Sequence, residues 1–284
     1  QDEKGKAITS TAKPAAGSVP AGISPKWKAN QYTVTFAANG GSVASATKKV
    51  TYAQPYGDLP VPVKEGSNFV GWQDASGKTV TAATEVNRAE NHTLTAQWAE
   101  KHQHKVDPNG SDTVEFAQEL TQAMMDSAGS ESMTLAAGNY YLTEDISTNV
   151  KFMVSGTVRI CFNGHTLTYN GAATDGKGVL GVDKNATLEL CDCQGTGGVN
   201  SGTHRAIYIY SGGTARLYGG TFTGAAGETL LAYGSVIVDG AKLVSDRHIA
   251  LNAQSNSNVL IKSGSLESSG TSASPVTIYT KNFR

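Results

Sequence analysis

The sequence of 284 residues has little cysteine, little charge and no long apolar run. Three cysteines, Cys161, Cys191 and Cys193, are too few for a disulfide-built scaffold, and they lack the second pair of ligands that a zinc site needs. The net charge of −1 gives no strong field for nucleic acid or an anionic membrane. No segment approaches the roughly 18 to 20 apolar residues that span a bilayer, so we expect no direct membrane insertion.

Glycine is abundant instead. With 32 glycines and only 7% aromatic residues, the composition favours many turns and short strands, and therefore an all-β fold. Residues 1–30 mix Ala, Ser, Gly, Pro and Lys without a hydrophobic period, which indicates a flexible tether. No signal peptide begins at Gln1, so we expect processing upstream of it.

Residues 31–99 predict a small β domain. The run "YTVTF" places Val34 and Phe36 on one face of a strand, and the "NGG" that follows supplies residues tolerant of positive φ, which predicts a hairpin. Three further segments, "KKVTYA", "NFVGW" and "HTLTAQW", have strand character. Such a small core needs aromatic side chains, and we assign this structural role to Phe36, Trp72 and Trp98, together with Phe69, Tyr52 and Tyr56.

This segment resembles the Listeria-Bacteroides repeat, also known as the B-repeat of internalin-like surface proteins. The residues that carry the likeness are "YTVTFAANGGSV", "VTYAQPYGDLPVPVKEG", "NFVGW" and "HTLTAQW". The resemblance implies a small β-grasp-like spacer of secreted, wall-attached bacterial proteins. Family members more usually have an Asp after the first Phe and an aromatic residue after "EG", where this chain has Ala37 and Ser67.

A polar linker is expected at residues 100–111, and a helix after it. The linker contains "HQH", in which His102 and His104 lie on one side of an extended segment; no further ligand at a defined spacing completes a metal set, so we expect adventitious binding at most. In residues 112–126, the spacing of the apolar residues and a capping-box pattern predict an amphipathic α-helix that caps the next domain.

Residues 112–284 contain a repeat with loops of uneven length. The repeat is carried by "TVRICFNGHTL", "TLELCDCQGTGGV", "TARLYGGTF", "SVIVDGAKL" and "NVLIKSGSL", whose starts lie about 20 to 30 residues apart, as in a β-solenoid. Two inward columns follow from this frame. One contains Val158, Leu188, Ala215, Val236 and Val259, and the other contains Ile160, Leu190, Leu217, Val238 and Ile261.

Between these columns the frame places an outward ladder of Arg159, Glu189 and Arg216, followed by Ile237 and Leu260. We expect the charged part to be exposed, with each pair contributing less than about 1 kcal/mol and helping to set register. Cys161 and Cys191 share one offset and should stack on adjacent coils. Our interpretations of this pair, in order of preference, are buried free thiols, a structural disulfide and a metal site.

The second region resembles the right-handed parallel β-helix of the pectin-lyase-like superfamily. The residues that carry the likeness are "AGNYYLTEDI", "ICFNGHTLT", "LELCDCQGTGGV" and "IYIYSGGTARLYGGTFTG". That superfamily includes polysaccharide lyases, hydrolases and noncatalytic adhesins, so it implies a fold and an extracellular address rather than one activity. A lyase or hydrolase needs grouped acidic residues, and Asp183, Asp192 and Asp239 occupy different offsets in the frame.

Tyrosines are the main candidate for ligand binding. Tyr208 and Tyr210 alternate with Ile207 and Ile209 and should point outward, near Tyr218 or Tyr233, where they could stack on sugar rings or meet a protein. We therefore predict a noncatalytic, adhesin-like surface protein, secreted or attached to the cell wall, with an extracellular glycan or host protein as partner. We predict no cofactor, metal, catalytic residue or nucleic-acid partner. The alternatives are a polysaccharide lyase or glycoside hydrolase, and a purely structural stalk.

Overall fold

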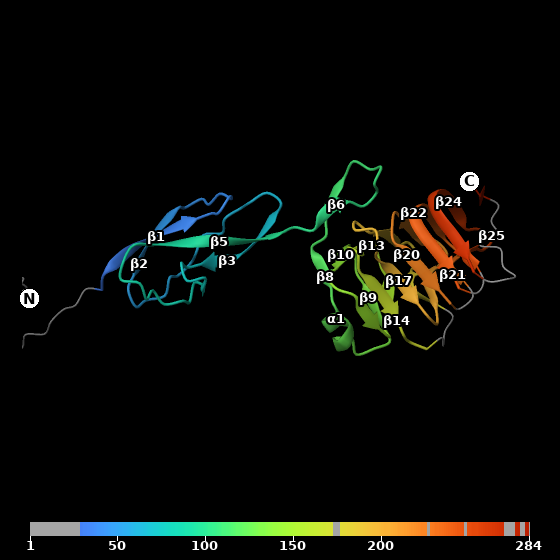
Figure 1. The fold of residues 1–284 in the computed structure, drawn as a ribbon, viewed down its shortest axis with the longest axis horizontal. Helices are drawn as coiled ribbons and strands as arrows, with labels where there is room; N and C mark the ends of the chain where they lie inside the picture. The colour runs from blue at the N-terminus through green and yellow to red at the C-terminus, as the bar shows by residue number, and fades with distance from the viewer. Residues whose placement is uncertain are drawn as a thin grey trace, which may run out of the picture. The chain divides into compact units, whose positions relative to one another are not determined.

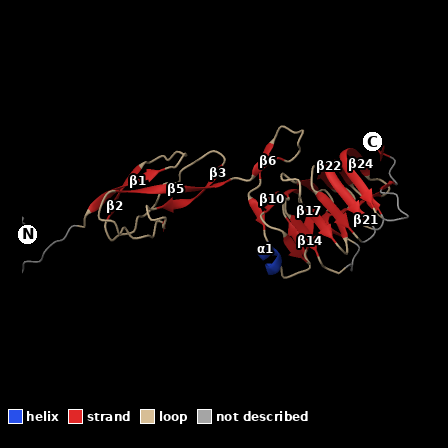
Figure 2. Ribbon diagram, viewed as in Figure 1, coloured by secondary structure: helices blue, strands red, loops and turns tan. Residues whose placement is uncertain are grey.

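The computed structural model describes residues 29–172, 177–225, 228–246 and 249–269, and the backbone of two short strands at 276–278 and 282–283. The described residues are nearly all in strands and loops (Figures 1 and 2). The chain divides into two compact units between Glu100 and Lys101. Residues 1–28 of the predicted tether lie outside the described residues.

The first unit is a five-stranded mixed sheet in the order β2-β1-β5-β3-β4. β1 and β5 run parallel at its centre, and the remaining neighbours are antiparallel. The predicted hairpin is confirmed, because β1 pairs with β2 after a turn in which Asn39 and Gly40 have φ of 48° and 86°. The strands are β1 (Gln31–Ala37), β2 (Thr47–Thr51), β3 (Ser67–Gln73), β4 (Thr79–Val80) and β5 (His92–Glu100).

Aromatic rings fill the core of this sheet. Phe36 and Trp72 are buried, with ring centroids 5.0 Å apart, and Trp98 packs partly buried against Phe69. The indole N–H of Trp98 donates to the carbonyl of Ala38, in the turn. A Cβ on Gly41 would lie 2.7 Å from the Trp98 ring, so the second glycine of "NGG" is required by close packing.

Tyr52 contradicts the sequence prediction of a core role. Tyr52 is 43% exposed, and it directly follows β2, in which only Val50 is buried. Tyr56, by contrast, is buried and its hydroxyl bonds to His92. Of these two tyrosines, Tyr56 alone is part of the core. Its hydrogen-bond partner, His92, was not predicted from the sequence.

The second unit is a parallel β-solenoid whose strands stack in three columns, with one strand of each column per coil (Figure 1). Column A contains β8 (Gln118–Leu120), β10 (Gly138–Leu142), β13 (Thr157–Cys161), β16 (Thr187–Cys191), β19 (Thr214–Leu217), β22 (Ser235–Ser245), β24 (Asn258–Ser268) and β26 (Asn282–Phe283). Column B contains β11 (Ile146–Thr148), β14 (Thr166–Tyr169), β17 (Gly198–Ser201), β20 (Thr221–Gly224) and the second halves of β22 and β24.

Column C completes each coil. It contains β9 (Ser132–Leu135), β12 (Lys151–Val154), β15 (Gly178–Val182), β18 (Arg205–Ile209), β21 (Glu228–Ala232), β23 (Ile249–Ala253) and β25 (Val276–Ile278). The predicted register of column A is confirmed, since Val158 pairs with Leu188 and Leu188 with Ala215, and the two inward columns continue to Val259 and Ile261. Apolar side chains of the three columns form one continuous core.

The predicted capping helix at residues 112–126 is wrong. This stretch forms β7 (Thr113–Glu115), β8 and a six-residue helix α1 (Gln122–Ser127), with Thr121 as its N-cap. β8 extends column A by pairing with β10, and β7 pairs with β6 (Gln103–Lys105), a strand within the predicted linker. An isolated helix of about this length is marginal in water, so pairing with β6 and β10 in the folded chain overrides the local helical pattern.

Candidate functional site

The β6–β7 hairpin brings two histidines and two cysteines together. His102 precedes β6 and His104 lies within it, Cys161 ends β13, and Cys193 follows β16 in the next coil. One donor atom from each of the four side chains lies within 4.8 Å of the other three. Among the residues that the structure describes, these four are the one group of at least three potential metal ligands whose donor atoms lie close together. We refer to it as the His/Cys cluster.

Three distances define the cluster. His104 Nε2 lies 3.1 Å from Cys161 Sγ, and Cys161 Sγ lies 3.6 Å from Cys193 Sγ. Cys193 Sγ in turn lies 4.0 Å from His102 Nε2. All three cysteines are free thiols, so the sulfurs face one another without a covalent bond.

Aromatic stacking orients both imidazoles. His102 stacks on Tyr141 with centroids 4.6 Å apart and planes 9° apart, and His104 stacks on Phe116 at 4.6 Å. His104 Nδ1 lies 2.8 Å from the carbonyl of Lys105, which only accepts, so Nδ1 carries the proton. Its Nε2 faces Cys161 Sγ.

The loop that carries Cys193 is held by Asp192. One carboxylate oxygen accepts the backbone N–H of Gly164 at 2.7 Å, and the other accepts that of Gly197 at 2.6 Å. These charge-assisted hydrogen bonds span two coils and fix the loop. The "CDC" stretch thus has alternating roles: Cys191 is buried, Asp192 fastens the loop, and Cys193 is exposed beside the histidines.

The thiols differ in their electrostatics. Hydrogen bonds from the Cys191 thiol, and then from His104 and His102, hold the pKa of Cys161 well below its ordinary value. Its partner Cys191 has a raised pKa because it donates to Cys161 and is buried. Burial, followed by the charge of Cys161, raises the pKa of Cys193 to about 12. The pKa of Cys161 is therefore lowered, and those of Cys191 and Cys193 are raised.

Sequence reasoning missed this cluster because its ligands are far apart along the chain. The sequence argument rejected "HQH" as a metal site because no further ligands were at a defined spacing, and it rejected the cysteines because they lack a second pair of ligands. In the structure, the two histidines and two of the cysteines supply the missing ligands to each other. His104 and Cys161 are 57 residues apart, and His102 and Cys193 are 91 apart. The sequence did contain one signal: the shared offset of Cys161 and Cys191 places Cys193 close to Cys161 on the adjacent coil. Only the structure places "HQH" beside these two cysteines.

The predicted Arg–Glu–Arg ladder has the expected register but not the expected exposure. Glu189 is paired with Arg159 and Arg216 on the neighbouring coils, and its two oxygens accept from them at 2.7 Å each. The Glu189 side chain is only 11% exposed, and those of the two arginines are 32% and 37% exposed. The buried Glu189 carboxylate contacts two arginines that are each about a third exposed, so the assumption of a fully solvated ladder was wrong.

The four candidate tyrosines divide between two places. Tyr208, Tyr210 and Tyr233 gather on column C, with ring centroids of 4.6 Å for Tyr208–Tyr210 and 5.8 Å for Tyr208–Tyr233. Ile207 and Ile209 point inward, and Tyr233 is 39% exposed. Burial, followed by its two tyrosine neighbours, raises the pKa of Tyr208. These three residues are the tyrosine cluster.

Tyr218 is not part of the tyrosine cluster. It follows β19 on column A and packs, partly buried, against the apolar group of Val106, Phe116, Cys161 and Cys191. The outer faces of columns A and C are on different sides of the coil, which explains the separation. Tyr218 therefore belongs to the surroundings of the His/Cys cluster.

A polar row borders the tyrosine cluster. Arg205 Nε donates to Glu228 at 2.7 Å, and the Asn252 amide donates to the other oxygen of Glu228 at 2.8 Å. Asn252 continues the outward row of Tyr208 and Leu231 on column C. The charge of Arg205 also acts on Tyr208. Aromatic faces and fixed hydrogen-bonding groups therefore lie side by side on this sheet.

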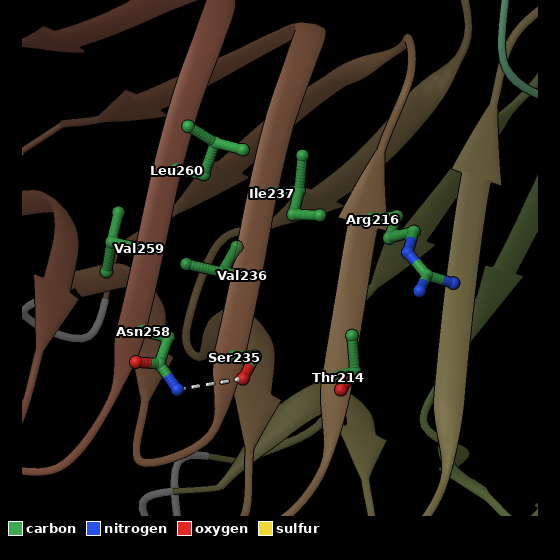
Figure 3. Close-up of a pocket in the computed structure, with 8 residues that line it drawn as sticks. All are labelled: Thr214, Arg216, Ser235, Val236, Ile237, Asn258, Val259 and Leu260. Carbon is green, nitrogen blue, oxygen red and sulfur yellow. Dashed lines mark hydrogen bonds between the residues drawn. The ribbon is translucent and has the colours of Figure 1, made fainter. Parts of the chain in front are cut away.

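A shallow hollow lies on column A towards its later coils (Figure 3). Arg216, Ile237 and Leu260 lie in one row across neighbouring strands, with Thr214, Ser235 and Asn258 in another. The Asn258 amide donates to Ser235 Oγ at 3.5 Å. The outward ladder thus changes from charged to apolar along the solenoid. This hollow holds neither a carboxylate nor a thiol among its lining residues.

The aspartates considered for catalysis have structural contacts. Asp183 accepts from the backbone N–H of Lys184, and Asp192 fastens the Cys193 loop. Asp239 is buried and contacts Lys262 at 3.3 Å and Ser263 at 2.9 Å. These three carboxylates lie in separate hydrogen-bonding environments.

Residues 32–97 match the family model of the Listeria-Bacteroides repeat domain, which confirms the resemblance for this segment. The chain is also 35% identical, over 99 residues, to a protein of Evansella cellulosilytica named "Putative membrane protein". That match covers 34% of this chain and 15% of the relative. No solved structure matched the chain. In the part of the chain that the structure describes, no helix is long and apolar enough to cross a membrane.

Proposed function

We propose that this chain is part of a noncatalytic bacterial surface protein that binds a glycan through the tyrosine cluster of its β-solenoid. The repeat domain is typical of surface proteins, and a surface or structural role fits its combination with a β-solenoid. The protein is secreted or attached to the cell wall. We further propose that the solenoid is a right-handed member of the pectin-lyase-like superfamily and that the first unit is related to the β-grasp fold.

The tyrosine cluster is the observation that carries the proposal. Three neighbouring phenol rings, one of them 39% exposed, offer flat apolar faces. The largely buried Arg205–Glu228–Asn252 row fixes the sheet beside them. Pyranose rings present C–H faces, which match the faces of the phenol rings. A protein ligand would gain less from a row whose charges already neutralise one another.

Binding to an array of neutral and acidic glycans tests the proposal. Tyr208→Ala and Tyr233→Ala should each weaken binding about two- to twelvefold, the equivalent of about 0.5 to 1.5 kcal/mol per aromatic contact. Tyr52→Ala is the matched control, because Tyr52 is also exposed but lies in the first unit. Unchanged binding in both cluster variants would reject the tyrosine cluster as the site.

The same protein, incubated with polysaccharides, tests the alternatives. Shortening of any chain, with or without Ca²⁺, would replace the binding proposal with a lyase or hydrolase activity. Absence of both binding and cleavage across a broad set would leave the structural stalk. Neither outcome is expected if the tyrosine cluster holds an intact glycan.

A further inference from the structure

We propose that His102, His104, Cys161 and Cys193 bind one Zn²⁺ ion as a structural site. This inference is independent of glycan binding, since the His/Cys cluster and the tyrosine cluster share no residue. The metal would join the β6–β7 hairpin to the first coils of the solenoid.

The spacing of the donor atoms fits tetrahedral zinc. With Zn–S bonds of about 2.3 Å and Zn–N bonds of about 2.0 Å, a tetrahedral ion separates its two sulfurs by about 3.8 Å and each nitrogen from a sulfur by about 3.5 Å. The two sulfurs here are 3.6 Å apart. The two nitrogen–sulfur distances, 3.1 Å and 4.0 Å, bracket the expected value. Small rotations of the side chains would place all four atoms around one ion.

The donor set selects the metal. Two imidazole nitrogens and two thiolates in a tetrahedral arrangement are typical of zinc, whereas Ca²⁺ and Mg²⁺ prefer oxygen ligands in larger numbers. Four protein ligands leave no position for water or substrate, so the site is structural rather than catalytic. Binding changes no oxidation state, and any thiol that is protonated releases its proton when its sulfur joins the metal.

The surroundings orient the ligands as metal sites require. His104 donates its Nδ1–H to the carbonyl of Lys105, which leaves Nε2 for the metal. Tyr141 and Phe116 hold the two imidazole planes by stacking. Cys161 is buried in an apolar group, and Cys193 is exposed, which gives the ion a path of entry.

The ligands also come in two pairs from two elements. The histidines come from one segment, with His104 in β6 and His102 immediately before it. The cysteines come from adjacent coils, with Cys161 at the end of β13 and Cys193 two residues after β16. A hairpin of two three-residue strands has little stability alone. Zinc would therefore fasten the hairpin over Glu189 and the apolar surface beside it.

Metal content and cobalt spectroscopy test the site on the full chain. The protein is purified under reducing conditions, mixed with Zn²⁺ and dialysed, and its zinc is measured by mass spectrometry. We expect one zinc per chain, and with Co²⁺ in its place, the visible bands of a tetrahedral ion with a sulfur charge-transfer band. Absence of stoichiometric zinc in the reduced wild-type chain would overturn the proposal.

Matched variants separate ligation from folding. His102→Ala and Cys193→Ala should each weaken zinc binding at least about a hundredfold, since even outer-shell partners of metal ligands cost 10- to 100-fold. His165→Ala is the control, because the His165 imidazole contacts Asp145 and lies outside the His/Cys cluster. Its zinc content should be that of the wild type. Equal zinc affinity in both ligand variants and the wild type would refute the assignment.

Two further measurements keep the test decisive. Amide hydrogen exchange across residues 101–116 should slow when zinc is added, and exchange across residues 31–99 should not change. Thiol alkylation followed by mass analysis detects oxidation. A Cys161–Cys193 disulfide that persists in protein prepared with zinc would show that these sulfurs form a bond rather than a metal site, and would overturn the proposal.

Discussion

Removing the carboxylate of Glu189 should destabilise the solenoid by about 1.5 to 3 kcal/mol. Its two oxygens accept from Arg159 and Arg216 at 2.7 Å each. A hydrogen bond to a charged group contributes about 1.5 to 3 kcal/mol, so two would contribute about 3 to 6 kcal/mol in a dry site. About a third of each arginine side chain is exposed, and solvent screening roughly halves that sum for Glu189→Ala.

The assay is urea denaturation of the full chain with two optical probes. All three tryptophans in the sequence precede Lys101, so tryptophan fluorescence follows the first unit alone. Far-ultraviolet circular dichroism includes the solenoid, which holds most of the strands. In Glu189→Ala, the solenoid transition should move to lower urea, and the fluorescence transition should stay where it is in the wild type.

Glu267→Ala is the control for a solvated ion pair. Glu267 contacts Lys242 at 2.8 Å, but both side chains are nearly half exposed, so its loss should cost less than about 1 kcal/mol. A cost for Glu189→Ala no larger than that of Glu267→Ala would refute the argument that burial strengthens the bridge. A shift of the fluorescence transition would show that the change acts outside the solenoid.

Two further substitutions test close packing and a buried hydrogen bond. Gly198→Ala would place a Cβ 1.8 Å from the carbonyl oxygen of Thr221 and should lower the stability of the solenoid by at least about 1 to 3 kcal/mol. In the control Gly202→Ala, the new Cβ would meet no atom within 4 Å, so the stability should change by less than about 0.5 kcal/mol. Equal urea midpoints for the two variants would contradict the close approach at Gly198. Tyr56→Phe removes the hydroxyl that donates to His92 Nε2 at 2.6 Å, and it should lower the stability of the first unit by about 1 to 2 kcal/mol. The change is measured by urea denaturation with tryptophan fluorescence. An unchanged midpoint would show that His92 finds another hydrogen-bond partner.

The solenoid register was accessible from the sequence because it depends on a simple period. Side chains alternate between two faces of a strand, and stacked coils bring equal offsets together. The pairing of Val158 with Leu188, and of Arg159 with Glu189, follows from those two facts alone. The first β hairpin was accessible for a similar reason, because alternation and an Asn-Gly-Gly turn are both local signals.

The capping helix failed because local pattern competed with distant pairing. Residues 113–120 carry a helical stripe, but β6 and β10 offer them backbone hydrogen bonds that no local window reveals. The predicted solvent exposure of Glu189 was wrong for the same reason. The frame correctly predicted that Glu189 points outward, but it could not include the two cations that close over the side chain and leave it 11% exposed.

The sequence by itself determined the two β units, the coil register and the inward columns, because each of these depends on residues that are neighbours in the chain or in the repeat. Only the tertiary structure decided that the hairpin folds onto column A and places His102 and His104 beside Cys161 and Cys193. Those ligands are brought together by chain closure over 57 and 91 residues. No periodicity encodes such a closure, since it depends on where the hairpin packs and not on its own pattern.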